Sequence, residues 1–519
     1  MSIENKIENL ERKTREYTYD LRVIVRRQPL NELLAILSSF LWPNELAWED
    51  LRRRTRNNNQ LLTKIKIFIP SLAKFAIINS NNHVGQSNRN IDDFYRDLLK
   101  AIDLIIEIKD WLPFNSFPDA DFAYSAWQFV LANQQFPLQE NPKNHITRYF
   151  QIYKRIPLEM NSQLNIDGAF QHIFGVPIER FWLLILKTLL GYKGAWVKED
   201  KFLGLNEGPY NITEKEFTNF FNTLSVDYSG FKVLSKNESF SLTGSSTQFY
   251  GFTPFDQFPT IKNESEILIL SPYYLAKKLS YSVYFDLLHF FQNGEDPRRN
   301  PFSNEFGLVF ENYVGKQLNN LNDGGELIHE FEFDTDNKKF TDWSLLYGDQ
   351  LILIEVKKSL LPNSIKFLMD KVELKNVLKR NIIYGLKQCY SKINHIKNET
   401  RGLELFSDTA NFYPLIVVFD DSYLLNNYFI RRIIDEVLAE EEIVFEKNWQ
   451  IITVRELENI VNVCSEEKTL LSILQEKIVN EDNIFMDWDK YLASIDIEIG
   501  ENELLEETFK EELELINAI

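Results

Sequence analysis

The stretch FTDWSLLYGDQLILIEVKKS, at residues 340 to 359, restricts the possible folds more than any other part of this chain. Strand-forming apolar residues stand on both sides of Gly348-Asp349, a dipeptide that suits a two-residue hairpin turn. In a hairpin closed by that turn, Asp342 lies opposite Glu355. Because like charges that face each other across two strands repel, the predicted hairpin requires a compensating positive group.

Lys357 supplies a positive charge at the right place. It follows Glu355 by two positions, so strand periodicity turns both side chains to one face while Val356 points to the other. Two converging carboxylates form a hard oxygen site for Mg²⁺ or Mn²⁺, and a nearby ammonium group can position a metal-bound water. The pattern therefore predicts a hydrolytic metal site, with an ordinary hairpin that has charged ends as the alternative.

The same Glu-x-Lys spacing occurs at Glu107 and Lys109, in a segment with helical periodicity. Residues two apart on a helix diverge by about 200° around its axis, so these two side chains do not converge. The Glu355 copy differs because it ends an apolar strand and has an aspartate opposite it across a turn.

The net charge of −19 is unusual for a protein that handles nucleic acid, but the charge is unevenly distributed. Residues 433–519 hold 24 acidic and 6 basic residues, a balance of −18, so the first 432 residues are nearly neutral. Residues 356–397 hold ten Lys and Arg against two acidic residues, a balance of +8 directly after the predicted site. A phosphate backbone bound at that site needs counter-charge at this position.

Six cationic side chains of this basic run are expected to contact phosphate. They are Lys358, Lys366, Lys371, Lys375, Lys379 and Arg380. A solvated helix face is the alternative, since lysines at four-residue spacing usually have that meaning. Lys358 also points away from Lys357 if the strand continues to it.

The composition excludes several other functions. Two cysteines, Cys389 and Cys464, and six scattered histidines cannot form the ligand clusters of zinc fingers or iron–sulfur sites. A glycine-rich loop followed by Lys-Ser or Lys-Thr is absent, so nucleotide hydrolysis has no support. The start, MSIENKIENLERK, carries charges where a secretory signal has an apolar core. We expect a cytoplasmic protein that does not associate with membranes.

The order of elements predicts a multidomain α+β protein. Residues 1–230 read as a mostly helical region for sensing, specificity or assembly, and residues 231–298 as a mixed connecting region. Residues 299–460 read as an α-β-β-β-α-β domain. Its expected elements are a helix in SNEFGLVFENYVGKQLNNL, the strands ELIHEFEF, KFTDWSLLY and QLILIEVKK, a helix within RNIIYGLKQCYSKINHI and a strand YPLIVVFD, with WQIITV as a further strand. Residues 461–519 read as an acidic tail whose leucines have helical spacing, which favours a docked amphipathic helix over disorder.

Asp342, the Glu355-Val356-Lys357 run and this element order resemble the PD-(D/E)xK nuclease superfamily, which has the restriction-endonuclease-like fold. Thr341 stands where the family pattern has Pro. The resemblance implies that Asp342, Glu355 and the Val356 carbonyl hold Mg²⁺ or Mn²⁺ and that Lys357 activates water. It also implies that a glutamate of the preceding helix joins the metal site, matched by Glu311, and that a glutamine of the following helix, matched by Gln388, stands beside it.

The resemblance, which extends to large bacterial proteins of restriction and anti-phage defence, implies a metal-dependent endonuclease that acts on DNA. An RNA-directed nuclease and a non-cleaving scaffold subunit that binds nucleic acid or protein are the alternatives. A protein partner is expected to bind through the N-terminal region or the acidic tail, and oligomers are compatible with the sequence. The opposite charges of the tail and the basic run further predict that the tail folds over the basic surface and inhibits cleavage, with docking of a basic partner by the tail as the alternative.

Overall fold

The structure is a computed structural model that places most of the chain. It describes residues 3–42, 49, 51–53, 59–80, 90–109, 128–129, 132–133, 141–192, 194–198, 212–237, 253–292 and 300–518, apart from 335, 369, 421, 444 and 498. Within these ranges, no helix combines the length and the apolar character needed to cross a bilayer.

A five-stranded sheet forms the centre of the C-terminal part, in the order β11-β10-β9-β8-β5. Its strands are β5 (Glu326–His329), β8 (Trp343–Tyr347), β9 (Gln350–Lys357), β10 (Asn411–Val418) and β11 (Gln450–Thr453). The first three pair antiparallel, whereas β9, β10 and β11 pair parallel. β9 is therefore central, and its residues 351–355 are buried.

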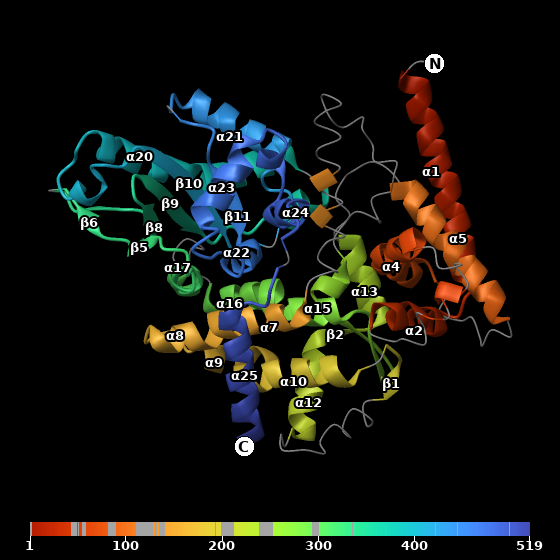
Figure 1. Ribbon diagram of the computed structural model, residues 1–519. Coiled ribbons are helices and arrows are strands. Elements are labelled where there is room, and N and C mark those ends of the chain that lie inside the picture. Colours follow the sequence, from red (N-terminus) through yellow and green to blue (C-terminus); the bar gives the residue numbers. More distant parts are fainter. Residues whose placement is uncertain are drawn as a thin grey trace.

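Alternate side chains of β9 enter two different cores, which defines the two faces of the sheet. Leu351 and Leu353 pack with apolar side chains of the helices α19 (Lys371–Leu378), α20 (Tyr384–Lys397) and α21 (Tyr428–Glu440). Ile352 and Ile354 pack with those of α17 (Pro301–Asn319), α22 (Val454–Val461) and α23 (Leu470–Val479). Helices therefore cover both faces of the sheet (Figure 1).

The predicted hairpin, the helix after it and the strands YPLIVVFD and WQIITV are confirmed as β8-β9, α20, β10 and β11. The predicted single strand ELIHEFEF is wrong, because it divides into β5 and β6 (Glu332–Phe333). β5 pairs with β8, but β6 pairs with β7 (Lys338–Lys339) in a separate two-stranded ribbon. At the division, the Glu330 N–H donates to the Asp342 carbonyl over 3.0 Å.

The part before residue 300 is mainly helical, with a small four-stranded sheet in the order β1-β4-β3-β2. The predicted boundary after residue 230 falls inside α13, and this sheet takes strands from both sides of it. The predicted boundary near residue 298 lies in 293–299, outside the described residues. The elements are α1 (Ile3–Arg26), α2 (Leu30–Leu41), α4 (Asn59–Asn79), α5 (Ile91–Lys109), α7 (Pro142–Phe150), the π-helical turn η3 (Gln151–Arg155), α8 (Ile156–Glu159), α9 (Ile166–Phe174), α10 (Ile178–Gly191), β1 (Val197–Lys198), α12 (Glu214–Leu224), β2 (Ser225–Val226), α13 (Tyr228–Asn237), β3 (Thr260–Asn263), β4 (Glu266–Ile269), α15 (Pro272–Lys277), the π-helical turn η6 (Lys278–Ser282) and α16 (Val283–Gln292).

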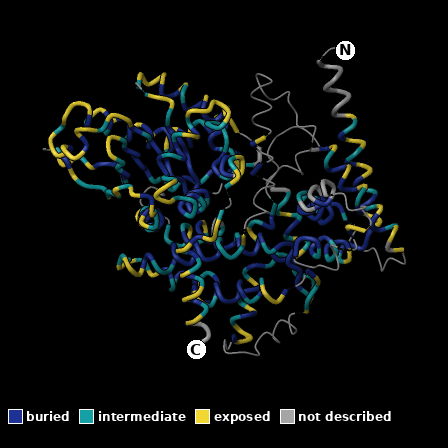
Figure 2. The backbone as a smooth tube through the Cα atoms, in the orientation of Figure 1, coloured by how far each residue is buried: buried dark blue, intermediate teal, exposed yellow. Residues whose placement is uncertain are grey.

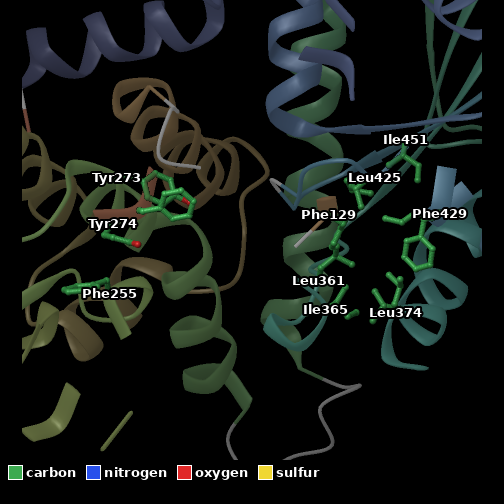
Figure 3. Packing of buried hydrophobic residues seen from close by; sticks show 14 of the residues in the cluster. Phe129, Phe255, Tyr273, Tyr274, Leu361, Ile365, Leu374, Leu425, Phe429 and Ile451 are labelled. Carbon is green, nitrogen blue, oxygen red and sulfur yellow. The ribbon is translucent and has the colours of Figure 1, made fainter. Parts of the chain in front are cut away.

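The helical part and the sheet share apolar cores. Phe419, which follows β10, contacts the rings of Tyr149, Tyr284 and Phe306 at centroid distances of 4.8 to 6.4 Å. Phe129 belongs to the other core, and Figure 3 shows it beside Leu361, which follows β9. The sheet that carries the predicted site thus shares its two apolar cores with segments from both halves of the chain.

The acidic tail contains α23 and two further helices, α24 (Trp488–Ser494) and α25 (Glu503–Ala518). α25 lies against α7 and η3, where Glu506 pairs with Lys143 and Glu512 pairs with Arg155. The predicted docked helix is confirmed, but its expected position over the basic run is wrong. Figure 1 shows α25 at the end of the molecule opposite α20, and Figure 2 shows buried residues concentrated along the strands of the five-stranded sheet.

Candidate active site

The hairpin has the predicted register. Gly348 takes the positive φ of 61° that the tight turn requires, and Trp343 pairs with Ile354. Asp342 directly precedes β8, so it stands at the position opposite Glu355. Its Oδ2 accepts a hydrogen bond of 2.7 Å from the Val356 N–H, which fixes the carboxylate at the end of the hairpin.

Glu355 and Lys357 lie together on the face of β9 that α20 covers. The Lys357 ammonium donates to Glu355 Oε2 over 2.5 Å, and the Glu355 side chain is 1% exposed. Glu355 Oε1 is buried and has no hydrogen-bond partner among the described residues. Since buried carboxylate oxygens normally have partners, this oxygen has spare capacity to bind a ligand.

The electrostatics of the cluster follow from two carboxylates and one ammonium group. Burial, and then the neighbouring Asp342, raise the pKa of Glu355 to about 7. Burial also raises the pKa of Asp342, although Lys357 and the Val356 N–H oppose this. Burial acts to lower the pKa of Lys357, but Glu355 and Asp342 outweigh it and the pKa rises. The lysine is therefore cationic at neutral pH, and one positive charge does not balance the acidic pair.

Glu311 reaches the cluster from α17. Burial, and then Asp342, raise its pKa, so the two carboxyl groups are close enough to repel. Its Oε1 lies 3.3 Å from Nε2 of His329, a residue that was not predicted for the site. His329 pairs with Trp343 in the β5-β8 ladder and so stands next to Asp342. The sequence held no turn signal that fixed this pairing, which is why His329 was missed.

α20 closes the other side of the cluster. A Cβ at Gly385 would lie 3.0 Å from Cε of Lys357, so the glycine makes room for the lysine. Gln388 lies one turn further on this helix, half-buried, and its Oε1 is without a partner among the described residues. Lys392, one turn beyond, lies within electrostatic range of Glu355. Gln388 is thus on the predicted side of the site, and Lys392 joins it.

Asp342 is the neighbour that Glu311 and Glu355 share, because the pKa values of both respond to it. Across the described ranges, no three His, Cys, Asp or Glu side chains form a ready-made group that could hold a metal ion. The donor chemistry nevertheless fits Mg²⁺ or Mn²⁺, because buried carboxylates of raised pKa and an unpartnered Oε1 can accept a cation. Asp342 and Glu355 are the side chains best suited to hold it.

Two of the six predicted phosphate contacts point into the protein. The Lys358 ammonium donates to the carbonyl of Ser303 and lies 2.8 Å from the Oγ of Ser303. Burial lowers the pKa of Lys358. Lys366 pairs with Asp420 over 2.5 Å, with side chains 12% and 2% exposed. The prediction that Lys358 and Lys366 bind phosphate is corrected accordingly, since both ammonium groups are committed to internal partners.

The other predicted contacts lie at the surface. Lys371, Lys379 and Arg380 are exposed, and Lys375 lies 3.4 Å from Glu440 at the end of α21. Lys387, also of the basic run, pairs with Glu441 over 2.7 Å. Part of the acidic charge of residues 433–519 thus stands beside the basic run, which lowers the net positive field of that run.

We expect Lys366→Gln to destabilise the fold by about 3 kcal/mol, because breaking a buried ion pair leaves the Asp420 carboxylate without its cation. The matched control is Lys379→Gln, which changes an exposed lysine and should alter stability by less than about 0.5 kcal/mol. Urea unfolding of both variants measures the difference. Equal unfolding midpoints would show that Lys366 is not a structural residue.

A comparison of the chain with models of known protein families finds no matching model, and a comparison with curated proteins finds no matching protein. The chemistry of the site is therefore inferred from its own residues. These are an acidic pair at the end of a hairpin, a lysine bonded to one of the pair, and helices on two sides that add a glutamate and a glutamine.

Proposed function

We propose that this protein is a metal-dependent nuclease that hydrolyses phosphodiester bonds of DNA. The observation that carries the proposal is the convergence of Asp342, Glu355 and Lys357 at the open end of the β8-β9 hairpin. An acidic pair with one member fully buried (Glu355) and the other half-buried (Asp342) is costly to a fold unless it has a use, and cation binding is the use that its chemistry favours.

Asp342 and Glu355 would hold Mg²⁺ or Mn²⁺ together with the Val356 carbonyl, and Glu311 would contribute through its position beside Asp342. The bound ion would supply positive charge to the scissile phosphate and its developing negative charge. The Val356 N–H keeps one Asp342 oxygen oriented, so the carboxylate needs little rearrangement to bind.

Lys357 is suited to orient the attacking water and to stabilise negative charge on the phosphate. Its raised pKa keeps it protonated, so it acts as a hydrogen-bond donor rather than as a base. Gly385 leaves the space in which the ammonium group sits, and Gln388 offers an unpartnered oxygen on the same side. Water and phosphate both supply groups that such donors and acceptors can bind.

The arrangement of elements also supports the proposal. Along the chain, a helix (α17), three strands that pair antiparallel (β5, β8 and β9), a helix (α20) and a parallel strand (β10) come in this order, with the β6-β7 ribbon and further helices between them. This is the order expected from the likeness to restriction-endonuclease-like nucleases. The helical N-terminal part would serve sensing, specificity or assembly, in a role within anti-phage defence or restriction.

The proposal is tested by incubating the purified protein with plasmid DNA, single-stranded DNA and RNA, in Mg²⁺, Mn²⁺ or EDTA. DNA cleavage that requires the metal and is lost in Asp342→Ala and Lys357→Ala supports it, while Glu107→Gln on α5 is the control. Preferential cleavage of RNA would favour the RNA-directed alternative. Binding of nucleic acid without cleavage of any substrate would favour the scaffold alternative.

The exposed part of the basic run gives a separate prediction. Replacing Lys371, Lys375, Lys379 and Arg380 by Gln should weaken DNA binding and reduce the slope of log affinity against log salt by roughly 3 to 4, since each of the four phosphate contacts contributes about 0.9. Metal binding should not change. Binding titrations at several salt concentrations measure the slope, and an unchanged slope would assign these residues to a solvated helix face.

Gly385→Ala tests the space beside Lys357. The added methyl group would meet Cε of Lys357 at 3.0 Å and Cδ1 of Ile416 at 3.1 Å, so the ammonium group must shift. We expect cleavage to fall at least about 10-fold, because small displacements of catalytic groups are costly. The melting temperature should stay near the wild-type value, since Ala favours a helix over Gly. Wild-type activity would show that Lys357 need not occupy its observed position.

A further inference from the structure

Tyr384 is an exposed aromatic residue at the edge of the candidate site. The residue is 55% exposed, although tyrosine rings bury large areas in most folds. The Lys357 ammonium lies 5.8 Å from the centre of its ring, within the range of a cation–π contact. One part of the ring therefore touches the proposed catalytic lysine and much of the rest faces outward.

The local backbone sets the position of this ring. Tyr384 is the first residue of α20 and directly follows the π-helical turn η8 (Lys379–Ile383). A π-helical turn adds a residue to a helix and rotates the residues after it, and such turns occur frequently at functional sites. Gly385, next in the chain, has no side chain to separate the helix from Lys357.

Tyr384 also begins a stripe of side chains along α20. Gln388 and Lys392 follow it at four-residue steps, so the three lie on one side of the helix. The middle member has an unpartnered oxygen and the last lies within electrostatic range of Glu355. These three groups suit three parts of a nucleotide. The aromatic ring can stack on a base, the amide can hydrogen-bond to the polar edge of the base, and the cation can pair with a phosphate.

We infer that Tyr384 is a stacking platform for the base next to the scissile phosphate, and that the preferred substrate is single-stranded DNA. This inference rests on the proposed function and names its substrate class. A base in a duplex has both faces covered by its neighbours, whereas an unpaired base can lay one face on the ring. Stacking of this kind tolerates any base, so no sequence preference is expected from it.

The other explanation is that Tyr384 only holds Lys357 in place through the cation–π contact. That role would make Tyr384→Ala reduce the cleavage rate for single and double strands alike, with binding unchanged. A stacking platform instead predicts a loss of affinity that is specific to single strands. Binding and cleavage therefore separate the two roles.

The experiment measures binding of a fluorescent oligodeoxythymidylate and of a duplex of equal length by anisotropy, with Ca²⁺ in place of Mg²⁺. Tyr384→Ala should weaken binding of the single strand roughly 5- to 100-fold and leave the duplex within about 2-fold, while Tyr384→Phe should keep wild-type affinity. Tyr428→Ala is the matched control, because Tyr428 is 53% exposed but lies on α21 against Phe485. Its affinity should equal that of the wild type.

Equal affinity of Tyr384→Ala and wild type for the single strand would overturn the inference, as would an equal loss on the duplex. A larger loss on an RNA oligonucleotide of the same length would overturn the assignment to DNA. These measurements require no cleavage, so a failed platform and a failed nuclease proposal give different results. A protein that binds single strands through Tyr384 but cuts nothing would reject only the proposed function.

Discussion

Glu355→Gln should abolish metal-dependent DNA cleavage and, at the same time, stabilise the metal-free protein at pH 8. Cleavage should fall about 10³-fold or more, because the charge stabilisation that a bound ion supplies is worth several kcal/mol. The gain in stability has a separate origin. Glutamine keeps the shape of the side chain but removes a buried negative charge that faces another one.

The pH dependence of this gain follows from the raised pKa of Glu355. The pKa of Glu355 is about 7 in the folded protein, compared with an ordinary value of 4.5 for glutamate. Burial is the largest cause of this rise and the neighbouring Asp342 is the second. A carboxyl group with a raised pKa binds its proton more tightly when folded, so it favours folding below pH 4.5 and loses this contribution as pH rises through 7. The variant has no such loss. Its advantage should grow to about 2–3 kcal/mol between pH 4.5 and pH 8.

Urea unfolding in EDTA at pH 5 and pH 8 measures the difference, with Glu107→Gln as the control because Glu107 is exposed on α5. Adding Mg²⁺ should raise the stability of the wild type at pH 8 but not that of Glu355→Gln, since a ligand stabilises only the protein that binds it. Full cleavage by the variant would falsify the site. A variant less stable than wild type at pH 8 would show that Glu355 is a structural partner of Lys357.

The hairpin was predictable because all of its information is local. Gly348-Asp349 fixes the turn, the turn fixes the register, and the register places Asp342 opposite Glu355. The period of two then puts Lys357 beside Glu355, and the structure has these two groups 2.5 Å apart. Asp342, Glu355 and Lys357, the three residues at the centre of the candidate site, all lie within 16 consecutive residues, so local sequence patterns were sufficient to predict them.

The surroundings of the hairpin depend on pairings that no local pattern reports. Lys366 meets Asp420, 54 positions away, and Lys387 meets Glu441. In the sequence alone, the run of lysines resembled a phosphate-binding surface. Its net electric field, however, depends on which acidic residues the fold places beside the lysines. His329 was missed for the same reason, because the β5-β8 register has no turn signal of its own.

Truncation after Asn480 should unfold the protein or lower its melting temperature sharply, and should not activate it. The deletion removes four fully buried hydrophobic side chains, namely Trp488, Tyr491, Leu492 and Leu505. At roughly 1.5–3 kcal/mol for each, their burial is comparable with the whole stability of a typical domain. Trp488 also donates from its indole N–H to the Ile451 carbonyl of β11 over 2.9 Å, so its loss leaves a gap beside the sheet.

A second variant tests whether the acidic tail inhibits cleavage, and it does so even if the truncated chain does not fold. Replacing the exposed Glu503, Glu507 and Glu514 by Gln removes three charges from α25 without touching its pairs with Lys143 and Arg155. Because α25 lies on α7 rather than on α19 and α20, cleavage at low salt should equal that of the wild type. A rise in activity at low salt that disappears at high salt would instead mean that the tail leaves α7 and competes with DNA for the basic run.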